Sequence, residues 1–257
     1  ARLGANTALI TKSINNLGEM SCNPSIGGLG KGTVVHEIDA LDGIMGKAAD
    51  MAAIHYRVLN ASKGPAVQGP RIQADRKLYK KAVLSLMQAQ ANLQIIEDSV
   101  EDIEFVNHQV KAVVLASGNK IDTTCAVITT GTFLYGLMHT GEVKTEGGRV
   151  GEPNSKGISD CLRKAGFELL RLKTGTPARL DAKTINYEDL EIQASDETPT
   201  YMSYLTGKKY NSQVVCHLTH TNAHTHEIIK AAKDRAPLFN GQINSIGPRY
   251  CPSIEDK

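Results

Sequence analysis

Residues 21–33, with the sequence SCNPSIGGLGKGT, constrain the fold of this chain more than any other stretch. They hold four glycines beside Cys22 and Lys31, and they lead into a segment with helical spacing of apolar residues. Glycine lets a backbone approach a ligand closely, and the N–H groups that open a helix have no partner inside it and favour an anion. We therefore expect this turn to bind a phosphate or pyrophosphate of a cofactor, through Gly27, Gly28, Gly30, Lys31 and Gly32.

The turn matches neither of the two common phosphate-binding motifs. Its Gly-Lys-Gly-Thr run lacks the Gly-Lys-Ser/Thr ending of a Walker A loop. Its Gly28-Leu29-Gly30 run lacks the third glycine of a dinucleotide fingerprint. A glycine-rich turn that holds a buried cysteine, with no ligand, is therefore the alternative interpretation.

The composition is that of a folded globular chain. Of the 257 residues, 41% are hydrophobic and 22% are charged, which is enough for one large or two ordinary domains. The formal net charge of +2 does not require a nucleic-acid partner, although a local basic patch is compatible with one. Five cysteines without regular spacing argue against a disulfide framework and predict a reducing, cytoplasmic location.

The sequence shows neither a membrane span nor a signal peptide. No run approaches the roughly 18 apolar residues of a membrane span, and the first residues do not form a signal peptide. We therefore expect no membrane partner. The sequence starts without methionine and stops on Ser253–Lys257, so we expect a fragment of a longer protein.

The first half of the chain predicts alternating strands and helices. Residues 6–12 predict a buried strand, and apolar residues recur with helical spacing from Thr33 to Met51. Residues 56–73 are rich in glycine, proline and basic side chains, which predicts a long loop. Asp75 is expected to cap a helix that runs to about Gln90. Strands follow at 93–97, 103–106, 110–116 and 120–123, the last three as an antiparallel meander.

The order of these elements indicates the fold class. Cys125–Thr129 reads as a buried parallel strand that ends on a Thr130-Gly131 turn. Strand, helix, strand, meander and strand is the order of FAD-binding domains of the glutathione reductase type, which are Rossmann-like α/β folds with an antiparallel meander. By this analogy we predict an FAD-binding domain over 1–174, incomplete at its N-terminus, with Thr130 and Gly131 at the cofactor.

The last third of the chain predicts a second, inserted α/β domain over 175–257, also incomplete. Before it we expect a glycine-rich loop over 141–156, a helix to Ala165 and a strand at 167–172. Inside it, a polar stretch over 181–211 precedes a strand at 214–218 and a helix at 227–233.

Two cysteines lie where a thiol can be reactive. Cys22 precedes the glycine turn, where helix-terminal N–H groups and Lys31 favour a thiolate, and Cys251 lies in a loop dense with charge. A small buried hydrophobe is the alternative for each. Cys125, Cys161 and Cys216 lie in apolar strand or helix contexts and are expected to pack.

Histidines and basic residues form the other clusters. His217, His220, His224 and His226 lack a cysteine or glutamate at ligand spacing, so we predict no metal site. The basic residues of the two glycine-rich loops fit phosphates of a cofactor or RNA, with ordinary surface charge as the alternative. They are Arg57, Lys63, Arg71, Arg76 and Lys77 in the first group and Lys144, Arg149 and Lys156 in the second.

Six runs of residues together resemble the MnmG (GidA) family of tRNA uridine 5-carboxymethylaminomethyl modification enzymes. The resemblance covers essentially the entire chain. The runs are SCNPSIGGLGKG from Ser21, LNASKGPAV from Leu59, RIQADR from Arg71, LKTGTP from Leu172, THTN from Thr219 and GPRYCPSIEDK from Gly247.

This resemblance implies a flavoenzyme that modifies C5 of the wobble uridine of tRNA together with the GTPase MnmE. It implies FAD, NADH and methylenetetrahydrofolate as cofactors and co-substrate, a homodimer, and a cytoplasmic location. By motif, Cys22 and Cys251 match the two family cysteines implicated in catalysis. The positions that match cofactor-binding residues are Val100 and Ser155 for FAD and Gly247, Pro248, Arg249 and Tyr250 for the nicotinamide nucleotide. The family's Gly-x-Gly-x-x-Gly loop, expected before residue 1, is not in this sequence.

Uracil chemistry gives the two cysteines a role. C5 of uracil becomes a nucleophile once a thiolate adds at C6, and it then accepts a one-carbon unit. One of Cys22 and Cys251 would supply the thiolate. Three other functions stay open from the sequence: a folate- and FAD-dependent tRNA uridine methyltransferase similar to TrmFO, a non-catalytic RNA-binding or dimerisation module, and a generic pyridine nucleotide oxidoreductase.

Overall fold

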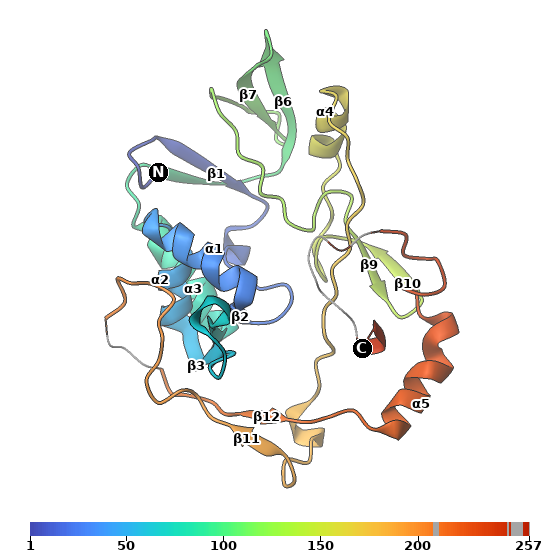
Figure 1. The fold of residues 1–257 in the computed structure, drawn as a ribbon. Coiled ribbons are helices and arrows are strands. Elements are labelled where there is room, and N and C mark those ends of the chain that lie inside the picture. Colours follow the sequence, from blue (N-terminus) through green and yellow to red (C-terminus); the bar gives the residue numbers. More distant parts are fainter. Residues whose placement is uncertain (208–210, 246, 248–253, 257) are drawn as a thin grey trace. The chain divides into compact units, whose positions relative to one another are not determined.

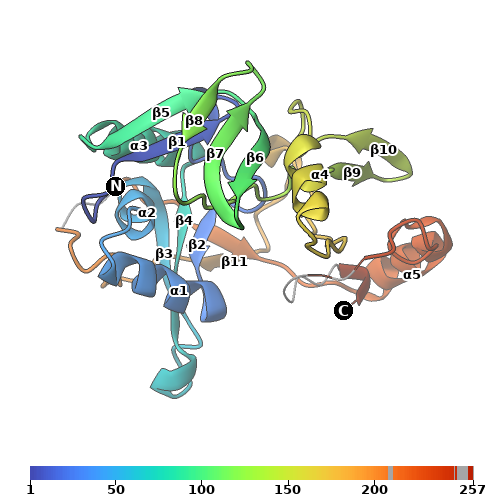
Figure 2. The ribbon, with the colours of Figure 1, turned by 90° about the horizontal axis from the view of Figure 1, so that it is seen from above.

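The computed structural model describes residues 1–207, 211–245, 247 and 254–256. Short sheets and helices alternate along the chain, so the fold is mixed α/β (Figures 1 and 2). The chain divides into two compact units, each of which combines separate segments. Unit 1 comprises Ala1–Leu9, Ser13–Ile96 and Thr176–His220, and unit 2 comprises Ile10–Lys12, Glu97–Gly175 and Thr221–Lys257.

An antiparallel sheet of three strands lies at the centre of unit 1, in the order β2 (Ser25–Gly27), β4 (Gly69–Ala74) and β3 (Ala53–Leu59). The long loop predicted over 56–73 is therefore wrong at both of its ends. Tyr56 pairs with Ile72 and both are buried, so the hidden face of this basic, glycine-rich stretch belongs to the core. Only the connection between the two strands, which holds the short helix η2 (Pro65–Val67), is a loop.

Two helices replace the single helix predicted over 33–51. The first, α1 (Leu29–Ala40), starts directly after the glycine turn, and α2 (Met45–Ala52) follows it. Asp42 in the connection has a φ of 61°, outside the helical range. At Gly43 a Cβ would lie 2.3 Å from Cγ2 of Ile38. This left-handed, crowded turn breaks the helix although the apolar spacing continues through it.

The helix predicted after Asp75 is confirmed as α3 (Arg76–Gln88). The Asp75 carboxylate accepts hydrogen bonds from the backbone N–H groups of Lys77 and Leu78, at 2.8 and 2.9 Å. This is the interaction by which an aspartate satisfies the first donors of a helix. Sheet and helices close over one apolar core, whose most buried members include Val35, Ala48, Tyr56, Ile72 and Met202.

The strand predicted at the start of the chain is confirmed as β1 (Thr7–Thr11), and that at 93–97 as β5 (Leu93–Glu97). The two strands pair with each other. Hydrogen bonds flank the pair at 3.0 Å from Thr7 to Asn92 and at 2.9 Å from Asp98 to Thr11. The start of β1 is thus bonded beside the start of β5, and the end of β1 beside the end of β5, so the two strands run parallel.

Unit 2 contains the predicted meander. Strands β6 (Val100–Val106), β7 (Gln109–Leu115) and β8 (Lys120–Asp122) pair antiparallel in that order. Asn107 and His108, with φ of 52° and 63°, make the tight turn between the first two, as expected for a two-residue hairpin. Helix α4 (Gly157–Lys164) packs against β6 (Figure 2), and Ile103, Ile158 and Cys161 form their buried contact.

Two predicted strands of unit 2 are wrong. Residues 125–129 and 167–171 have no regular structure, Leu172 forms an isolated β-bridge, and Val127 and Leu170 are 87% and 74% exposed. A buried strand needs neighbours on its edges, and none of the described strands pairs with either segment. Cys125 is exposed, so its predicted packing role is also wrong, whereas Cys161 is buried as expected.

The other elements are short. The loop predicted over 141–156 instead contains β10 (Val143–Glu146), which forms a hairpin with β9 (Leu137–Thr140). The strand predicted at 214–218 is confirmed as β12 (Cys216–Leu218), paired with β11 (Glu191–Gln193). The helix predicted at 227–233 is confirmed as α5 (Ala223–Ala232), which starts four residues earlier. The single-turn helices are η1 (Ile14–Asn16), η3 (Ala182–Thr184), η4 (Lys233–Arg235) and η5 (Ile254–Asp256).

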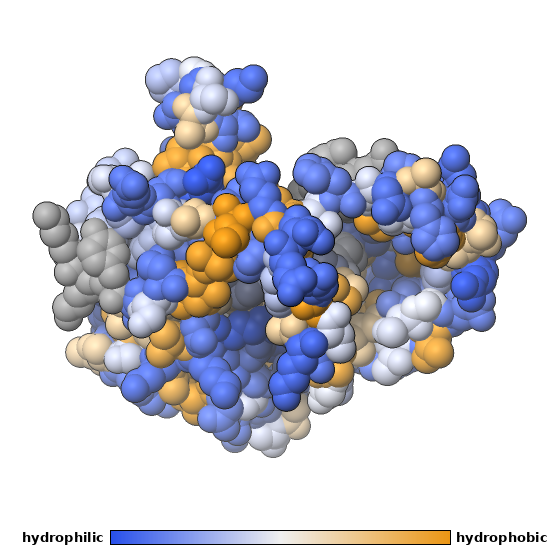
Figure 3. Space-filling view, turned by 90° about the horizontal axis from the view of Figure 1, so that it is seen from below, coloured by the Kyte–Doolittle hydropathy of each residue, from blue (hydrophilic) through white to orange (hydrophobic). Residues whose placement is uncertain are grey.

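On the face drawn in Figure 3, apolar side chains lie among polar ones. In the space-filling view, hydrophobic residues form small groups separated by hydrophilic ones (Figure 3). Within the part of the chain that the structure describes, no helix combines the length and the apolar character that a membrane crossing requires.

Candidate functional site

The glycine turn of unit 1 is pressed against strand β4. Gly27 has a φ of 101°, and a Cβ there would lie 2.2 Å from the carbonyl oxygen of Pro70. Gly28 has a φ of 98° and donates its backbone N–H to the same oxygen at 2.9 Å. A Cβ at Gly69 would in turn lie 3.0 Å from the carbonyl carbon of Gly28. These glycines are required by close backbone packing, whatever the turn binds.

Helix α1, which begins at this turn, also contains a glycine that close packing does not require. At Gly30, in the first turn of α1, a Cβ would meet no atom within 4 Å, whereas Gly32 is buried and a Cβ there would lie 3.4 Å from Pro70. The N-cap residue, Gly28, has no side chain to cap the helix, and the first turn holds no acidic residue. An open first turn with this polarity suits a bound anion.

Cationic side chains converge on the segment that precedes the turn. Lys31 donates through Nζ to the carbonyl oxygen of Ser25 at 3.2 Å, and Arg71 donates through Nη2 to the Ser25 hydroxyl at 3.4 Å. Arg76 donates through Nη2 to the carbonyl oxygen of Cys22. Cys22 itself is half-buried. The sequence showed Arg71 and Arg76 only as members of one basic cluster. The structure shows that they contact different residues, Ser25 and Cys22.

The flavin residues predicted in unit 2 gather around one turn. Phe133 donates its N–H to the carbonyl of Thr130 at 3.2 Å and accepts from the N–H of Ser155 at 2.8 Å. The carbonyl of Ser155 accepts from Tyr135 at 2.9 Å. Gly131, with a φ of 57°, starts this turn. Thr130 and Ser155 thus share one hydrogen-bonded cluster, and Gly131 lies in the turn between Thr130 and Phe133.

Val100 stands at the start of β6, beside the start of helix α4. Its neighbour Glu101 lies so close to that helix that a Cβ at Gly157 would meet the Glu101 carboxylate at 2.3 Å. The start of β6 therefore contacts the start of α4 through Glu101 and Gly157. Glu101 directly follows Val100, and Gly157 lies two residues after Ser155.

Lys12 joins these parts and was missed from the sequence. Its Nζ donates to the carbonyl oxygens of Pro153 and Asn154, at 3.0 and 2.7 Å. It also lies 5.3 Å from the centre of the Phe133 ring. Burial lowers the pKa of Lys12, against the opposing charges of Glu101 and Glu152. A lysine as the last residue of a strand predicted to be buried was the available signal.

Other predicted residues have plainer roles or are not described. Arg149 pairs with Glu152 at 2.8 Å and Lys156 with Glu146 at 3.1 Å, which favours the surface-charge interpretation for this loop. Gly247 is half-buried in unit 2. The predictions for Pro248, Arg249, Tyr250 and Cys251 lie outside the described residues.

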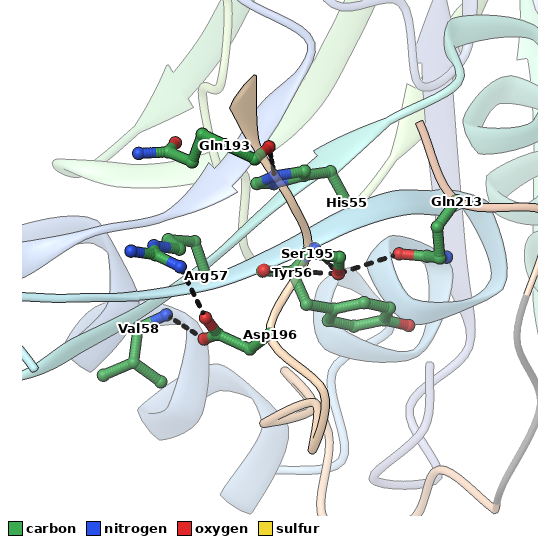
Figure 4. Close-up of polar contacts among 8 residues, drawn as sticks. All are labelled: His55, Tyr56, Arg57, Val58, Gln193, Ser195, Asp196 and Gln213. Carbon is green, nitrogen blue, oxygen red and sulfur yellow. Dashed lines mark hydrogen bonds and ion pairs between the residues drawn. The ribbon is translucent and has the colours of Figure 1, made fainter. Parts of the chain in front are cut away.

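The edge of strand β3 carries a polar cluster that the sequence did not reveal. Asp196 accepts from the N–H of Val58 at 2.7 Å and from Arg57 at 3.1 Å, while the N–H of Asp196 donates to the carbonyl of Tyr56 at 2.9 Å (Figure 4). The Ser195 hydroxyl accepts from the Tyr56 N–H at 2.9 Å. Two side chains thus bind the strand edge where a neighbouring strand would.

Two cavities adjoin this cluster, with volumes of about 420 and 370 Å³. Both are lined by residues 194–197; the larger adds Gln213–Val215, and the smaller adds Arg57. Neither is lined by Cys22 or by the glycine turn. Arg57 is the lining residue that the sequence analysis linked to phosphate binding, and its guanidinium is paired with Asp196. We therefore assign the candidate site to the glycine turn and not to these cavities.

A family model described as "Glucose inhibited division protein A" matches residues 1–257. Proteins named "tRNA uridine 5-carboxymethylaminomethyl modification enzyme MnmG" are similar over all of this chain. The one from Zymomonas mobilis is 54% identical over 257 residues, and the one from Rhodopirellula baltica is 46% identical over 267 residues. The chain spans 41% of the length of each of these curated relatives.

Solved structures of Aquifex aeolicus GidA have the same fold. The form I crystal structure matches with a TM-score of 0.90 and 47% identity, over 99% of this chain and 44% of that one. The form II structure matches with a TM-score of 0.88 and 44% identity, over 99% of this chain and 41% of that one. The glycine turn, the meander and the segments between them are thus all parts of one shared fold. With a family model that matches every residue from 1 to 257, the chain belongs to the glucose inhibited division protein A (GidA) family.

Proposed function

We propose that the protein containing this chain is an FAD-dependent enzyme that modifies C5 of the wobble uridine in tRNA. The group added is carboxymethylaminomethyl or aminomethyl, and the reaction uses methylenetetrahydrofolate and NADH together with the GTPase MnmE. The observation that carries the proposal is the family match over all 257 residues, with relatives of 46–54% identity whose names state tRNA uridine modification. We further propose a cytoplasmic homodimer.

We also propose that residues 1–174 belong to an FAD-binding domain of the glutathione reductase type and that 175–257 begin an inserted α/β domain. The parallel pair of β1 and β5 followed by the β6-β7-β8 meander, all within 1–174, supports the FAD-domain assignment. Two regions predicted to contact the cofactor have a geometry that fits this role. They are the open first turn of α1 at Gly30 and the cluster of Thr130, Gly131 and Ser155.

The residues of the glycine turn fit a phosphate of FAD. The first turn of α1 offers backbone donors and positive helix polarity, and Gly30 leaves its outer side open. In unit 2, Lys12 and the Phe133 turn fix the backbone around Ser155, the predicted flavin contact. When bound, reduced FAD would supply hydride-transfer chemistry at this site.

The cysteines would act on the uracil ring. A thiolate from Cys22 or Cys251 adds at C6, and the electrons of the C5=C6 bond move to C5 and the O4 carbonyl. C5 then attacks the methylene carbon of methylenetetrahydrofolate, and the electrons of the carbon–nitrogen bond that breaks move to the folate nitrogen. The amine of glycine, or ammonium, later displaces the folate nitrogen from this methylene to give the aminomethyl group. Loss of the C5 proton and departure of the thiolate restore the C5=C6 bond and free the cysteine. Cationic groups at Cys22–Ser25 hold the backbone that carries the first of these thiols.

The experiment that tests the catalytic part uses the full-length protein in cells that lack the endogenous gene. We expect Cys22→Ser and Cys251→Ser to abolish the modified wobble nucleoside, measured by mass spectrometry of total tRNA. Cys125→Ser is the matched control, because that thiol is exposed and belongs to no candidate site. Wild-type modification in the double cysteine variant would contradict the proposal.

The flavin part is tested by the visible absorbance of the purified full-length protein. We expect Gly30→Ala to reduce the flavin that co-purifies while the protein stays folded. Gly207→Ala is the control, because a Cβ at either glycine meets no protein atom within 4 Å. Equal flavin content in the two variants would count against a cofactor at this turn.

A further inference from the structure

The segment that carries Cys22 continues the pairing of strands β2 and β4. Ser25 pairs with Gln73, and beyond the end of β2 the N–H of Ala74 donates to the carbonyl oxygen of Pro24 at 2.6 Å. Two residues further along each segment, Arg76 begins helix α3 and Cys22 lies in a bend. The Arg76 side chain donates a hydrogen bond to the Cys22 carbonyl oxygen.

Arg76 is itself held at its base from two sides. It is the first residue of α3, and the Asp75 cap fixes the start of that helix. The Asp75 N–H also donates to the carbonyl oxygen of Ala52 at 2.9 Å. An arginine anchored by a sheet on one side and a capped helix on the other is a rigid support for the group that it contacts.

Cys22 lies in a bend between elements rather than in a helix or strand. A residue in such a bend owes its position to contacts from elsewhere in the chain. Lys80 and Glu19, paired at 2.7 Å, tie the same helix to the segment just before the bend. The charge-assisted bond from Arg76 then acts on the cysteine itself, and bonds of this kind are stronger than those between neutral groups.

We propose that Arg76 is a positioning residue that holds Cys22 for attack on the uracil ring. The inference rests on the proposed function, in which Cys22 serves catalysis. Arg76 acts through the main chain of Cys22 and is not assigned a contact with substrate. Because a misplacement of about 1 Å can reduce a rate about 100-fold, loss of this bond should lower turnover more than binding.

The experiment compares Arg76→Gln, Arg76→Lys, Lys81→Gln and Cys22→Ser in the full-length protein with tRNA. Lys81→Gln is the matched control, because it removes one positive charge from an exposed position of the same helix. We expect Arg76→Gln to lower kcat by about 10- to 100-fold with an unchanged KM for tRNA and unchanged flavin content. Arg76→Lys should recover part of kcat, because an ammonium also donates to a carbonyl. Lys81→Gln should match the wild type.

A second measurement reports on Cys22 without turnover. The rate at which iodoacetamide alkylates Cys22 in the native protein, followed by peptide mass spectrometry, should change in Arg76→Gln and stay constant in Lys81→Gln. Wild-type kcat in Arg76→Gln would overturn the inference, as would equal losses in Arg76→Gln and Lys81→Gln. A loss of kcat in both Arg76 variants that parallels a loss of flavin content would also overturn it, since the role would then be structural. Failure of the proposed function is distinct, because Cys22→Ser would then retain full activity.

Discussion

The hydroxyl of Thr206 donates a hydrogen bond of 2.7 Å to the carboxylate of Asp50, across 156 residues of sequence. The same carboxylate accepts from the N–H groups of Met202 and Ser203, each at 2.9 Å. Asp39 on α1 accepts from the N–H of Tyr204 at 3.0 Å. Two buried aspartates of helices α1 and α2 thus bind the returning segment 202–206. Since α1 opens at the glycine turn, this segment also supports the candidate site.

Replacement of Asp50 by alanine should destabilise unit 1 strongly. The side chain is 3% exposed, and its removal leaves the buried donors of Met202 and Ser203 without their acceptor. At about 1–3 kcal/mol for each unsatisfied donor, we expect a loss of about 3–5 kcal/mol in the free energy of unfolding. Chemical denaturation measures it. Asp189→Ala, at an exposed position, is the control and should match the wild type within about 0.5 kcal/mol.

The same carboxyl predicts a pH dependence. Burial raises the pKa of Asp50 above its ordinary 3.8, against the opposing hydrogen bonds from Met202, Thr206 and Ser203. The folded protein therefore holds this proton more tightly than the unfolded chain does. Proton binding at Asp50 therefore stabilises the folded state fully below pH 3.8. This stabilisation is lost as the pH rises through the raised pKa of the folded protein.

The comparison that isolates this effect is between the wild type and Asp50→Asn, because the other titrating groups are common to both. We expect the wild type's advantage in unfolding free energy to shrink as pH rises from below 3.8 to neutrality. Urea unfolding at a series of pH values measures it. If the wild type's advantage over Asp50→Asn stayed constant or grew with pH, burial would not be the dominant effect on the pKa of Asp50.

The two kinds of glycine in the turn should respond differently to alanine. Gly27→Ala places a methyl group 2.2 Å from the Pro70 carbonyl oxygen on a backbone with φ of 101°. We expect a loss of about 3 kcal/mol or more, the sum of overpacking and left-handed strain. Gly30→Ala meets no protein atom within 4 Å, so stability should stay constant or rise by about 0.5 kcal/mol. Thermal unfolding distinguishes the two, and equal losses would contradict the assignment.

Removal of the Asp196 carboxylate should loosen the edge of β3. Asp196→Ala takes the acceptor from the Val58 N–H, which the carboxylate binds at 2.7 Å. A hydrogen bond to a charged group contributes about 1.5 kcal/mol or more, so amide hydrogen exchange at Val58 should accelerate about tenfold or more. Glu197→Ala, at the exposed neighbouring position, is the control. Unchanged exchange at Val58 in the Asp196 variant would mean that this bond does not hold the segment.

The cysteines of unit 2 should differ in reactivity. Burial, with the nearby Asp102, raises the pKa of Cys161, and the thiol is 5% exposed, whereas Cys125 is exposed. Since the thiolate is the reacting form, iodoacetamide should label Cys125 first and leave Cys161 protected in the native protein. Peptide mass spectrometry gives the two rates, and labelling in urea is the control, in which both cysteines react. Similar native rates would contradict the burial of Cys161.

Sequence patterns predicted the elements whose bonds are local. The Asp75 cap depends on donors two and three residues away, and the β6-β7-β8 meander depends on tight turns between adjacent strands. The glycine turn before α1 was also predicted, because runs of glycine serve only a few purposes. The six motif runs sufficed to predict the family.

Tertiary structure decided whatever depends on partners distant in sequence. The stretch around Tyr56 and Ile72 is strand rather than loop because the two residues pair across the core. The apolar run 125–129 is not a strand, since an edge without a neighbour leaves its backbone groups unpaired. Neither the contact of Arg76 with Cys22 nor that of Asp50 with Thr206 leaves a periodic trace in the sequence. Hydrogen bonds across 54 and 156 residues exist only once the core has brought their donors and acceptors together.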